Sequence, residues 1–390
     1  MSAMMPTTTT PKIGIACSGL GHVRRGVETW SQEAFDALRE QGLHVTLFKG
    51  GGQNGAAHIE VLGCIKRYSR ASKALTRILP PFSWRLGLGS PYEIEQTTFT
   101  LSLLASHARR LDLVHTKDPQ VALLLQRAKR AGFSRAKVIL NHGTEESPDF
   151  LKQLDYVQHL APCHLEEAVQ QGVRIRKHFM VPNFVDTDKF APGLGSPVRA
   201  QLNIPPGAFV ILCVAAIKRS HKRIDWLLRE VSAVPADSAT GPYLVVVGSR
   251  TPETVSLLRM GSELLGNRVR FLLDQPHEEM PSIYRAADLF VLCSLKEMFP
   301  NALLEAMASG VPSLASTFPS TKWIVDDGGE CLDMAQDGAL TKAIAKYRDP
   351  ARRAEAGARA RAHIAANFAK PAVIGQQVRM YEEVLSDGRA

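Results

Sequence analysis

Two glutamates eight positions apart near residue 300 carry the clearest chemical signal in the sequence. Glu297 and Glu305 lie in the stretch KEMFPNALLEAMASGVP, which is rich in small residues. A buried carboxylate needs a partner, and two at this spacing could accept hydrogen bonds from opposite ends of one ligand. The plainer interpretation is a buried helix with an acidic residue near its start, where the helix dipole favours it.

A helix that starts at Pro300 would create an anion site between these two carboxylates. Proline suits the first helical position, because its missing N–H would have no partner there. The loop before it ends at Phe299, and the N–H groups of Asn301, Ala302 and Leu303 would point out of the helix start, so we predict that the residues from Phe299 to Leu303 bind the ligand. Together with the helix dipole, they attract phosphate. The carboxylate one turn inside could accept two hydroxyl hydrogen bonds, as from a ribose diol.

The same stretch resembles the E-x7-E signature of the retaining glycosyltransferases of family 4, the glycogen-synthase-like and sucrose-synthase-like group with the GT-B fold. Glu297 and Glu305 match its two glutamates, and FPNALLEAMASGVP follows the flanking pattern closely. The resemblance implies two Rossmann-like domains facing each other across a cleft. It also implies that Glu297 contacts the donor sugar, that Glu305 binds the ribose, and that amides near Asn301 hold the diphosphate.

The segment VPNFVD at residues 181–186 resembles the V-P-N-G-V-D segment at the end of the family's first domain, with Phe184 in place of the usual glycine. Asp186 and Asp188 form a D-x-D, which elsewhere suggests a divalent metal beside a nucleotide sugar. Because these residues match the family's linker, we predict no metal site here.

Basic residues follow the strand predicted at 209–214. The family carries an Arg and a Lys after this strand that grip the donor's phosphates. Lys222 matches the Lys, and we favour Arg219 over Lys218 for the Arg. Cations here would stabilise the charge that develops on a leaving nucleoside diphosphate. A solvated basic loop is the plainer interpretation.

A glycine-rich loop, SGLGHVRRG, follows the first predicted strand. It departs from the dinucleotide fingerprint, because its third glycine is displaced and no acid ends the second strand. The resemblance to the glycosyltransferases implies that the loop lines the cleft opposite the donor. Gly19 and Gly21 are predicted to let the backbone approach the ligand. His22 and Arg24 are candidates for acceptor or phosphate contacts, or for structural roles.

An Asn-His-Gly sequence follows the strand predicted at 137–140. The family often has His-Gly at this point, with the imidazole near the reacting sugar. The resemblance therefore makes His142 a candidate to orient the donor sugar, and a polar surface histidine is the alternative. His115 ends another predicted strand, and we predict a structural role for it.

The composition fits a globular protein of two domains. The chain has 390 residues, 45% hydrophobic and 22% charged, and single cores stop growing near about 250–300 residues. No stretch approaches the roughly 18 consecutive apolar residues of a membrane span, and the N-terminus lacks the pattern of a secretory signal. Six scattered cysteines without metal spacing favour a reducing cytoplasm.

The net charge of +9 implies attraction to polyanions. No recognised nucleic-acid module accompanies it, so we predict no nucleic-acid partner. The segment KRYSRASKALTRILPPFSWRLGL at residues 66–88 mixes basic and large apolar side chains without an acid. One hypothesis is that it rests on an anionic membrane, peripheral to its inner face. The alternative is a solvated basic helix beside the acceptor cleft.

Short β-branched runs alternate with amphipathic stretches, which predicts parallel, doubly wound α/β sheets. We expect a flexible leader at 1–11, an acceptor-side domain at 12–185, a linker at 186–200, a donor domain at 201–370 and a helix at 371–390 that crosses back to the first domain. The predicted strands are 12–17, 44–48, 111–115, 137–140, 179–181, 209–214, 243–247, 269–272, 288–292 and 311–315.

Together these features predict an enzyme that transfers a hexosyl or related group from a nucleoside-diphosphate sugar to a hydroxyl acceptor. The family implies retention at the anomeric carbon, and the product would be a glycan, glycolipid or glycoside. No cofactor is expected, and UDP or GDP is favoured over ADP in the donor. Two alternatives stay open: a non-catalytic nucleotide-sugar-binding protein of this fold, and an NAD-dependent oxidoreductase, which would need the missing ribose-binding acid.

Overall fold

The computed structural model describes residues 10–23, 25–54, 57–235 and 241–388. Contacts divide the chain into two compact units, of which the first holds residues 1–182 and 374–390 and the second holds residues 183–373. Most of the expected leader, residues 1–9, lies outside the described residues. The other expected domain limits stay predictions.

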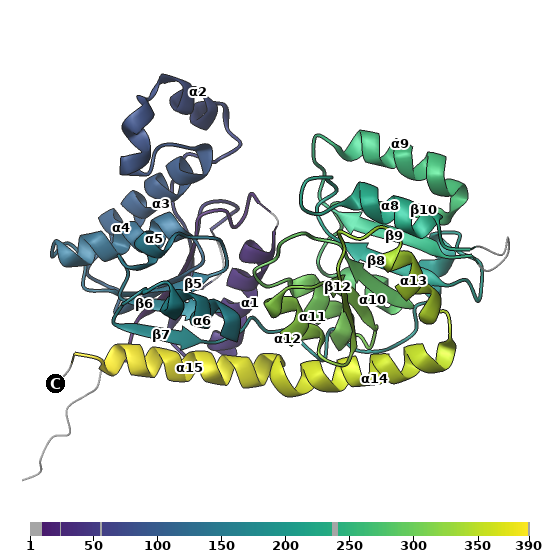
Figure 1. The fold of residues 1–390 in the computed structure, drawn as a ribbon. Helices are drawn as coiled ribbons and strands as arrows, with labels where there is room; N and C mark the ends of the chain where they lie inside the picture. Colours follow the sequence, from purple (N-terminus) through teal and green to yellow (C-terminus); the bar gives the residue numbers. More distant parts are fainter. Residues whose placement is uncertain (1–9, 24, 55–56, 236–240, 389–390) are drawn as a thin grey trace, which may run out of the picture. The chain divides into compact units, whose positions relative to one another are not determined.

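The first unit contains a parallel sheet of seven strands in the order β3-β2-β1-β4-β5-β6-β7 (Figure 1). The inner strand β1 pairs with β2 on one side and β4 on the other, so the chain order reverses between β1 and β4. The strands are β1 (Ile13–Cys17), β2 (Val45–Lys49), β3 (Ile59–Val61), β4 (Leu113–Thr116), β5 (Lys137–His142), β6 (Tyr156–His159) and β7 (Lys177–Met180).

Helices cover both faces of this sheet. Their bounds are α1 (Gly26–Glu40), α2 (Arg70–Ile78), the 3-10 turn η1 (Pro81–Leu86), α3 (Pro91–His107), α4 (Pro119–Arg130), α5 (Pro148–Leu151), α6 (Pro162–Gln170) and α15 (Lys370–Ser386). On one face, Phe99 of α3 and Val121 of α4 pack with Val114 of β4. His115, the next residue along that strand, faces the other way, where its Nδ1 lies 2.7 Å from the hydroxyl of Tyr381 in α15. His115 thus has the structural role predicted for it.

The second unit contains a parallel sheet of six strands in the order β10-β9-β8-β11-β12-β13. The chain order reverses between β8 and β11, as in a doubly wound nucleotide-binding sheet. The strands are β8 (Val210–Val214), β9 (Tyr243–Gly248), β10 (Val269–Leu273), β11 (Leu289–Leu292), β12 (Ser313–Ser316) and β13 (Gly329–Leu332). The helices are α7 (Ser196–Gln201), α8 (Ile224–Ser232), α9 (Thr254–Leu265), the 3-10 turn η2 (Gly266–Arg268), α10 (Met280–Arg285), α11 (Asn301–Ala308), α12 (Pro319–Val325), α13 (Ala339–Lys346) and α14 (Pro350–Asn367).

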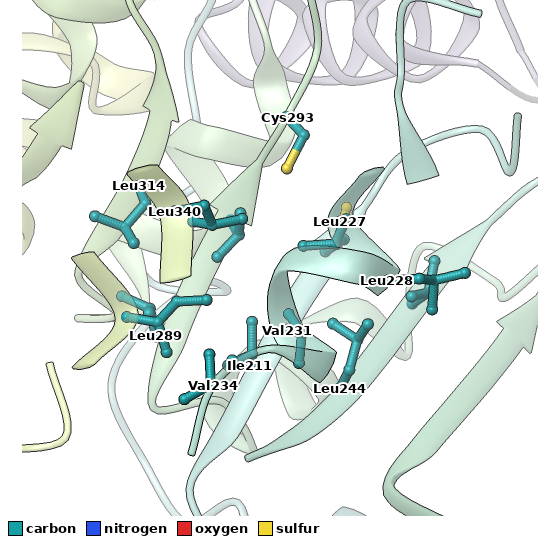
Figure 2. Close-up of a cluster of buried hydrophobic side chains, with 14 of the residues drawn as sticks. Ile211, Leu227, Leu228, Val231, Val234, Leu244, Leu289, Cys293, Leu314 and Leu340 are labelled. Atoms are coloured by element: carbon teal, nitrogen blue, oxygen red, sulfur yellow. The ribbon is translucent and has the colours of Figure 1, made fainter. Parts of the chain in front are cut away.

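Figure 2 shows the apolar core on one face of this second sheet. Leu227 and Val231 of α8 point toward Ile211 and Leu289 of the two central strands, and Leu340 of α13 lies beside them. All five side chains are fully buried. Burying a side chain of this size contributes about 1.5–3 kcal/mol, so this layer fixes the central strands, whose ends carry the candidate site.

The predicted class, two parallel doubly wound α/β sheets, is confirmed. Every strand predicted from the sequence is present, with bounds shifted by one or two residues. Three strands were not predicted: β3, β6 and β13. β3 and β13 are short and half-buried edge strands, and β6 (YVQH) is half polar, so none of the three has a continuous apolar run.

Among the helices of the described ranges, none combines the length and apolar character needed to cross a bilayer.

Candidate functional site

Two candidate residues of the second unit, Lys222 and Glu297, meet at the carboxyl ends of β8 and β11. These neighbouring strands mark the reversal of chain order in the sheet. Ligands of doubly wound sheets bind in the crevice at such a switch point. Lys222 lies in the loop that follows β8, and Glu297 lies in the loop that follows β11. The fold therefore brings together two groups of residues that are distant in the sequence.

An ion pair joins the two loops. The Nζ of Lys222 donates to the Oε1 of Glu297, and their side chains are only 18% and 15% exposed. The backbone N–H of Leu295 also donates to the carbonyl of His221 at 2.7 Å, which ties the same loops together through the main chain. The main-chain bond thus holds together the two loops that carry the ion pair.

The backbone around Lys222 is strained. His221 and Arg223, on either side of it, have φ angles of 38° and 52°, in the left-handed region. Such a conformation costs a non-glycine residue about 1–3 kcal/mol and gathers at functional sites. Arg223 is held there because its guanidinium donates to the carbonyl of Met334 and lies 4.5 Å from the ring centroid of Trp226.

Glu305 of α11 is held by two side chains that precede β11. The hydroxyl of Tyr284 donates to its Oε2 at 2.8 Å, and the Nε2 of His277 lies 3.1 Å from its Oε1. The Nδ1 of the same imidazole lies 3.2 Å from the Nζ of Lys189. Because an ammonium group only donates, Nδ1 accepts this bond, and Nε2 carries the proton that His277 gives to Glu305.

Tyr284 remains a donor to this carboxylate at any physiological pH. Its side chain is fully buried, and burial raises the pKa of Tyr284 well above its ordinary value, with the Glu305 carboxylate raising it further. Each carboxylate oxygen can accept about two hydrogen bonds. Glu305 is therefore fixed in place and can still accept one bond at each oxygen, as a diol would require.

Lys189, His277 and Tyr284 were not identified from the sequence. They lie far from Glu305 along the chain, and no spacing pattern links them to it. Only the parallel sheet, which places α10 and α11 next to each other, makes them neighbours.

The start of α11 differs by one residue from the expectation. The helix covers Asn301–Ala308, and Pro300 precedes its first turn with an extended ψ of 101°. The N–H of Leu303 donates to the carbonyl of Pro300 at 3.0 Å. Among the predicted amides, those of Asn301 and Ala302 have no acceptor within the described part of the chain. Asn183 donates to the Oδ1 of Asn301 at 2.8 Å, which brings Asn183 to the helix start.

Two residues predicted to contact the ligand have their side chains in the core. Leu303 is fully buried, and the ring of Phe299 lies 6.2 Å and 6.0 Å from the rings of Trp323 and Phe368. A ligand contact at either residue would use backbone atoms.

The guanidinium of Arg219 lies beside α9 rather than beside Lys222. It donates to the Oγ of Ser256 at 2.7 Å and lies 3.7 Å from the carboxylate of Glu253. The side chain is 40% exposed. The structure therefore does not bring Arg219 together with the Lys222–Glu297 pair, and its phosphate role stays a prediction.

In the first unit, His142 ends β5 in a group of buried imidazoles. Its ring lies 5.5 Å from that of His159, and its Nε2 lies 3.8 Å from a carboxylate oxygen of Glu146. Neither ring nitrogen has a hydrogen-bond partner within the described residues. Burial lowers the pKa of His142 to about 4, and His164 contributes to the shift. The imidazole is therefore neutral at physiological pH, and its role toward a sugar stays a prediction.

Lys117, just after β4, is a further buried group that the sequence analysis did not identify. It is 4% exposed, and its Nζ lies 4.5 Å from the ring centroid of Trp30. Burial lowers the pKa of Lys117 to about 7. A perturbed lysine at the carboxyl edge of a sheet is typical of functional sites.

The glycine-rich loop of the first unit packs against the chain itself. Gly21 has a φ of 94°, and a Cβ there would lie 2.1 Å from the carbonyl oxygen of Gly51. A Cβ at Gly19 would lie 2.3 Å from a carboxylate oxygen of Glu28. Gly21 therefore requires glycine for internal packing, whether or not a ligand also approaches it, whereas a Cβ at Gly19 would need the Glu28 side chain to move. His22 lies 2.8 Å from the carboxylate of Glu95, and Arg24 lies outside the described residues.

The D-x-D segment forms a turn. The Oδ1 of Asp186 accepts hydrogen bonds from the N–H groups of Asp188 and Lys189, and its Oδ2 pairs with Lys370 at 2.8 Å. Within the described ranges, no group of three or more His, Cys, Asp or Glu residues is arranged to hold a metal ion.

Superposition on solved structures of similar fold includes nearly all of this chain and nearly all of each of those chains. Sucrose-phosphate synthase from Thermosynechococcus elongatus superposes with a TM-score of 0.79 at 21% identity, over 96% of this chain and 99% of that one. HepE of Anabaena, in complex with UDP and glucose, superposes with a TM-score of 0.74 at 16% identity, over 96% and 100%. The chain has the GT-B fold.

Sequence similarity is concentrated in part of this GT-B chain. The model of the family "Glycosyl transferases group 1" matches residues 197–363, a range that contains Lys222, Glu297 and Glu305. D-inositol 3-phosphate glycosyltransferase of Mycolicibacterium smegmatis is 32% identical over 212 residues, which are 53% of this chain and 47% of the relative. The chain thus spans about half the length of the curated relatives it matches.

Proposed function

We propose that this GT-B protein transfers a sugar from a nucleoside-diphosphate donor to a hydroxyl acceptor. The observation that carries the proposal is the Lys222–Glu297 ion pair at the switch point between β8 and β11, with Glu305 one turn inside the helix that follows the same loop. All three lie within the segment that matches the glycosyltransferase family model. The relatives named as glycosyltransferases support the activity, and a neighbour of the same fold that binds UDP and glucose supports a nucleotide sugar as donor.

Each part of the donor has a partner of suitable chemistry in the second unit. Glu305, held by Tyr284 and His277, offers one acceptor site per oxygen to the ribose diol. The amides at the start of α11 and the ammonium of Lys222 would bind the diphosphate. Lys222 has three N–H donors, so it can keep its bond to Glu297 and still donate to phosphate oxygens. Glu297 would then contact the sugar.

The proposed reaction retains the configuration of the anomeric carbon. The bond from that carbon to the phosphate oxygen breaks, the bond to the acceptor oxygen forms on the same face, and the acceptor's proton passes to the departing phosphate oxygen. Lys222 and the helix amides stabilise the charge that develops on the diphosphate. Arg219 would add to this only after leaving Ser256, and His142 of the first unit stays a predicted contact to the sugar.

The first test is a thermal-shift screen of the protein with UDP, GDP, ADP and their sugars. We expect one base to raise the melting temperature, UDP or GDP before ADP, and the matching sugar donor to release free diphosphate when a hydroxyl acceptor is added. NMR of the product's anomeric proton would then report retention or inversion. The proposal fails if no nucleotide stabilises the protein. Stabilisation without turnover across an acceptor panel would support the non-catalytic alternative.

A further inference from the structure

Large apolar side chains gather on the outer surface of α2 and η1 in the first unit. Five of the exposed hydrophobic residues of the described chain lie within 19 positions here, and their side chains are 61% to 79% exposed. They are Tyr68 (70%), Ile78 (79%), Phe82 (62%), Trp84 (61%) and Leu86 (64%). We call these five residues, with the basic residues named next, the α2–η1 surface. Several large exposed apolar side chains within one short segment are typical of an interaction surface.

The same surface is strongly basic. The run from 62 to 92 contains no acidic residue, and none of its exposed basic side chains pairs with a carboxylate of the described residues. These side chains are Lys66, Arg70, Lys73, Arg77 and Arg85. Positive charge therefore accompanies the apolar groups without local compensation.

On α2 the basic side chains share one exposed stripe, and one large apolar side chain lies beside it. Arg70, Lys73 and Arg77 recur at helical spacing on one exposed stripe. Ile78 lies on the neighbouring exposed stripe, and Ser72 is the buried residue that faces inward. Figure 1 shows α2 lying over α3, on the side away from the sheet of its own unit. An amphipathic helix with this division is suited to lie in the plane of a membrane interface.

The surface has a rigid base. Arg67, 4% exposed, donates from its backbone N–H at 2.7 Å and its Nε at 2.8 Å to the carboxylate of Glu95 in α3. His22 of the glycine-rich loop contacts the same carboxylate. Burial raises the pKa of Glu95, but the bonds from Arg67 and His22 outweigh it and hold the pKa below the ordinary value. Glu95 thus stays charged, and it fixes the α2–η1 surface to the body of the unit.

We propose that the α2–η1 surface docks on an anionic lipid bilayer. The basic stripe would attract acidic headgroups, and each Lys or Arg near the surface adds to this attraction. Phe82, Trp84 and Leu86 would enter the boundary between headgroups and acyl chains, where Trp is favoured. A nucleic acid would use the cations but leave Ile78 and Leu86 in water, so the apolar residues favour the bilayer. The attachment does not depend on the proposed transfer reaction.

The test uses the full chain and vesicles of phosphatidylcholine, with or without phosphatidylglycerol, at low salt. We expect co-sedimentation with the anionic vesicles alone, reversed by salt. Trp84 is an internal reporter, since Trp30 and Trp226 are buried and Trp323 is half-buried against the rings of Phe299 and Phe368. Its emission should shift to the blue and be quenched by brominated lipids, and Trp84→Phe should lose most of this change. Absence of sedimentation, or equal binding to neutral vesicles, would overturn the proposal.

Paired variants locate the contact. Lys73→Glu with Arg77→Glu, and Phe82→Ser with Leu86→Ser, should each weaken vesicle binding by roughly tenfold or more. Matched controls are Arg109→Glu with Arg110→Glu for charge, and Phe133→Ser with Val255→Ser for exposed apolar groups, which are 68% and 73% exposed. Circular dichroism checks folding. Binding that falls equally in the controls, or tight binding of duplex DNA that competes with vesicles, would contradict a docking surface at α2–η1.

Discussion

The Nζ of Lys222 donates to the Oε1 of Glu297 across the two loops that follow the central strands of the second sheet. The two residues have opposite charges, so their variants should affect diphosphate binding in opposite directions. A diphosphate is attracted by the ammonium and repelled by the carboxylate. The ion pair therefore provides a test of both roles in one experiment.

Lys222→Ala should weaken binding of the stabilising nucleoside diphosphate by roughly tenfold to a hundredfold, because a hydrogen bond to a charged group contributes about 1.5–3 kcal/mol. Glu297→Gln should bind the same diphosphate at least as tightly as the wild type, because the ammonium loses its anionic partner. Isothermal titration calorimetry measures both. Equal affinities in wild type and Lys222→Ala would remove Lys222 from the diphosphate site.

Glu297→Gln should also lose sugar transfer while keeping the fold. The proposed role of this carboxylate is to contact the donor sugar, and an amide of the same shape lacks the charge that orients it. Turnover is measured with the donor identified by the thermal-shift screen, and the melting temperature serves as the control for folding. Wild-type turnover in this variant would contradict the role.

Glu305→Ala should weaken nucleotide binding only when the ribose has its hydroxyls. The carboxylate, fixed by Tyr284 at 2.8 Å and His277 at 3.1 Å, is proposed to accept bonds from the diol. Loss of these bonds should reduce affinity for the nucleoside diphosphate by roughly tenfold or more. With the 2′,3′-dideoxy analogue, wild type and variant should bind alike. An equal loss for both ligands would indicate that Glu305 has only a structural effect.

The two sheets and the candidate glutamates of this site were predicted from the sequence. The side chains that hold these glutamates in place were not. Continuous apolar runs such as 209–214 identified the central strands, because a buried parallel strand needs apolar residues on both faces. The contacts of Glu305 with Tyr284 and His277 depend on how two helices pack, which no local pattern encodes. The orientation of Arg219 toward Ser256 likewise depends on α9, an element whose residues no sequence motif connected to the site.

Buried histidines of the first unit should make its stability depend on pH. Burial lowers the pKa of His159 to about 3, with His142 and His178 contributing, whereas an unfolded histidine has a pKa near 6.5. The unfolded chain therefore binds more protons between about pH 6.5 and 3, and stability falls as the pH decreases through this window. At pH 5 the effect of this one group is about 2 kcal/mol.

His159→Gln should reduce the decline in unfolding free energy between pH 7 and pH 5, measured by urea denaturation. Glutamine has no proton to gain, so the variant should take up about one proton fewer on unfolding. His44→Gln, which removes the imidazole of an exposed histidine, is the control. A pH dependence that changes equally in both variants would contradict the argument from burial.

Gly21→Ala should destabilise the first unit far more than Gly132→Ala. Both glycines have a positive φ, 94° and 78°, so both substitutions add backbone strain of about 1 kcal/mol. A Cβ at Gly21 would also lie 2.1 Å from the carbonyl oxygen of Gly51, whereas one at Gly132 would have no described atom within 4 Å beyond its own residue and its two chain neighbours. We expect Gly21→Ala to lower the unfolding free energy by roughly 3 kcal/mol. Equal stability of the two variants, with weaker ligand binding in Gly21→Ala alone, would instead favour the predicted role of this glycine in ligand approach.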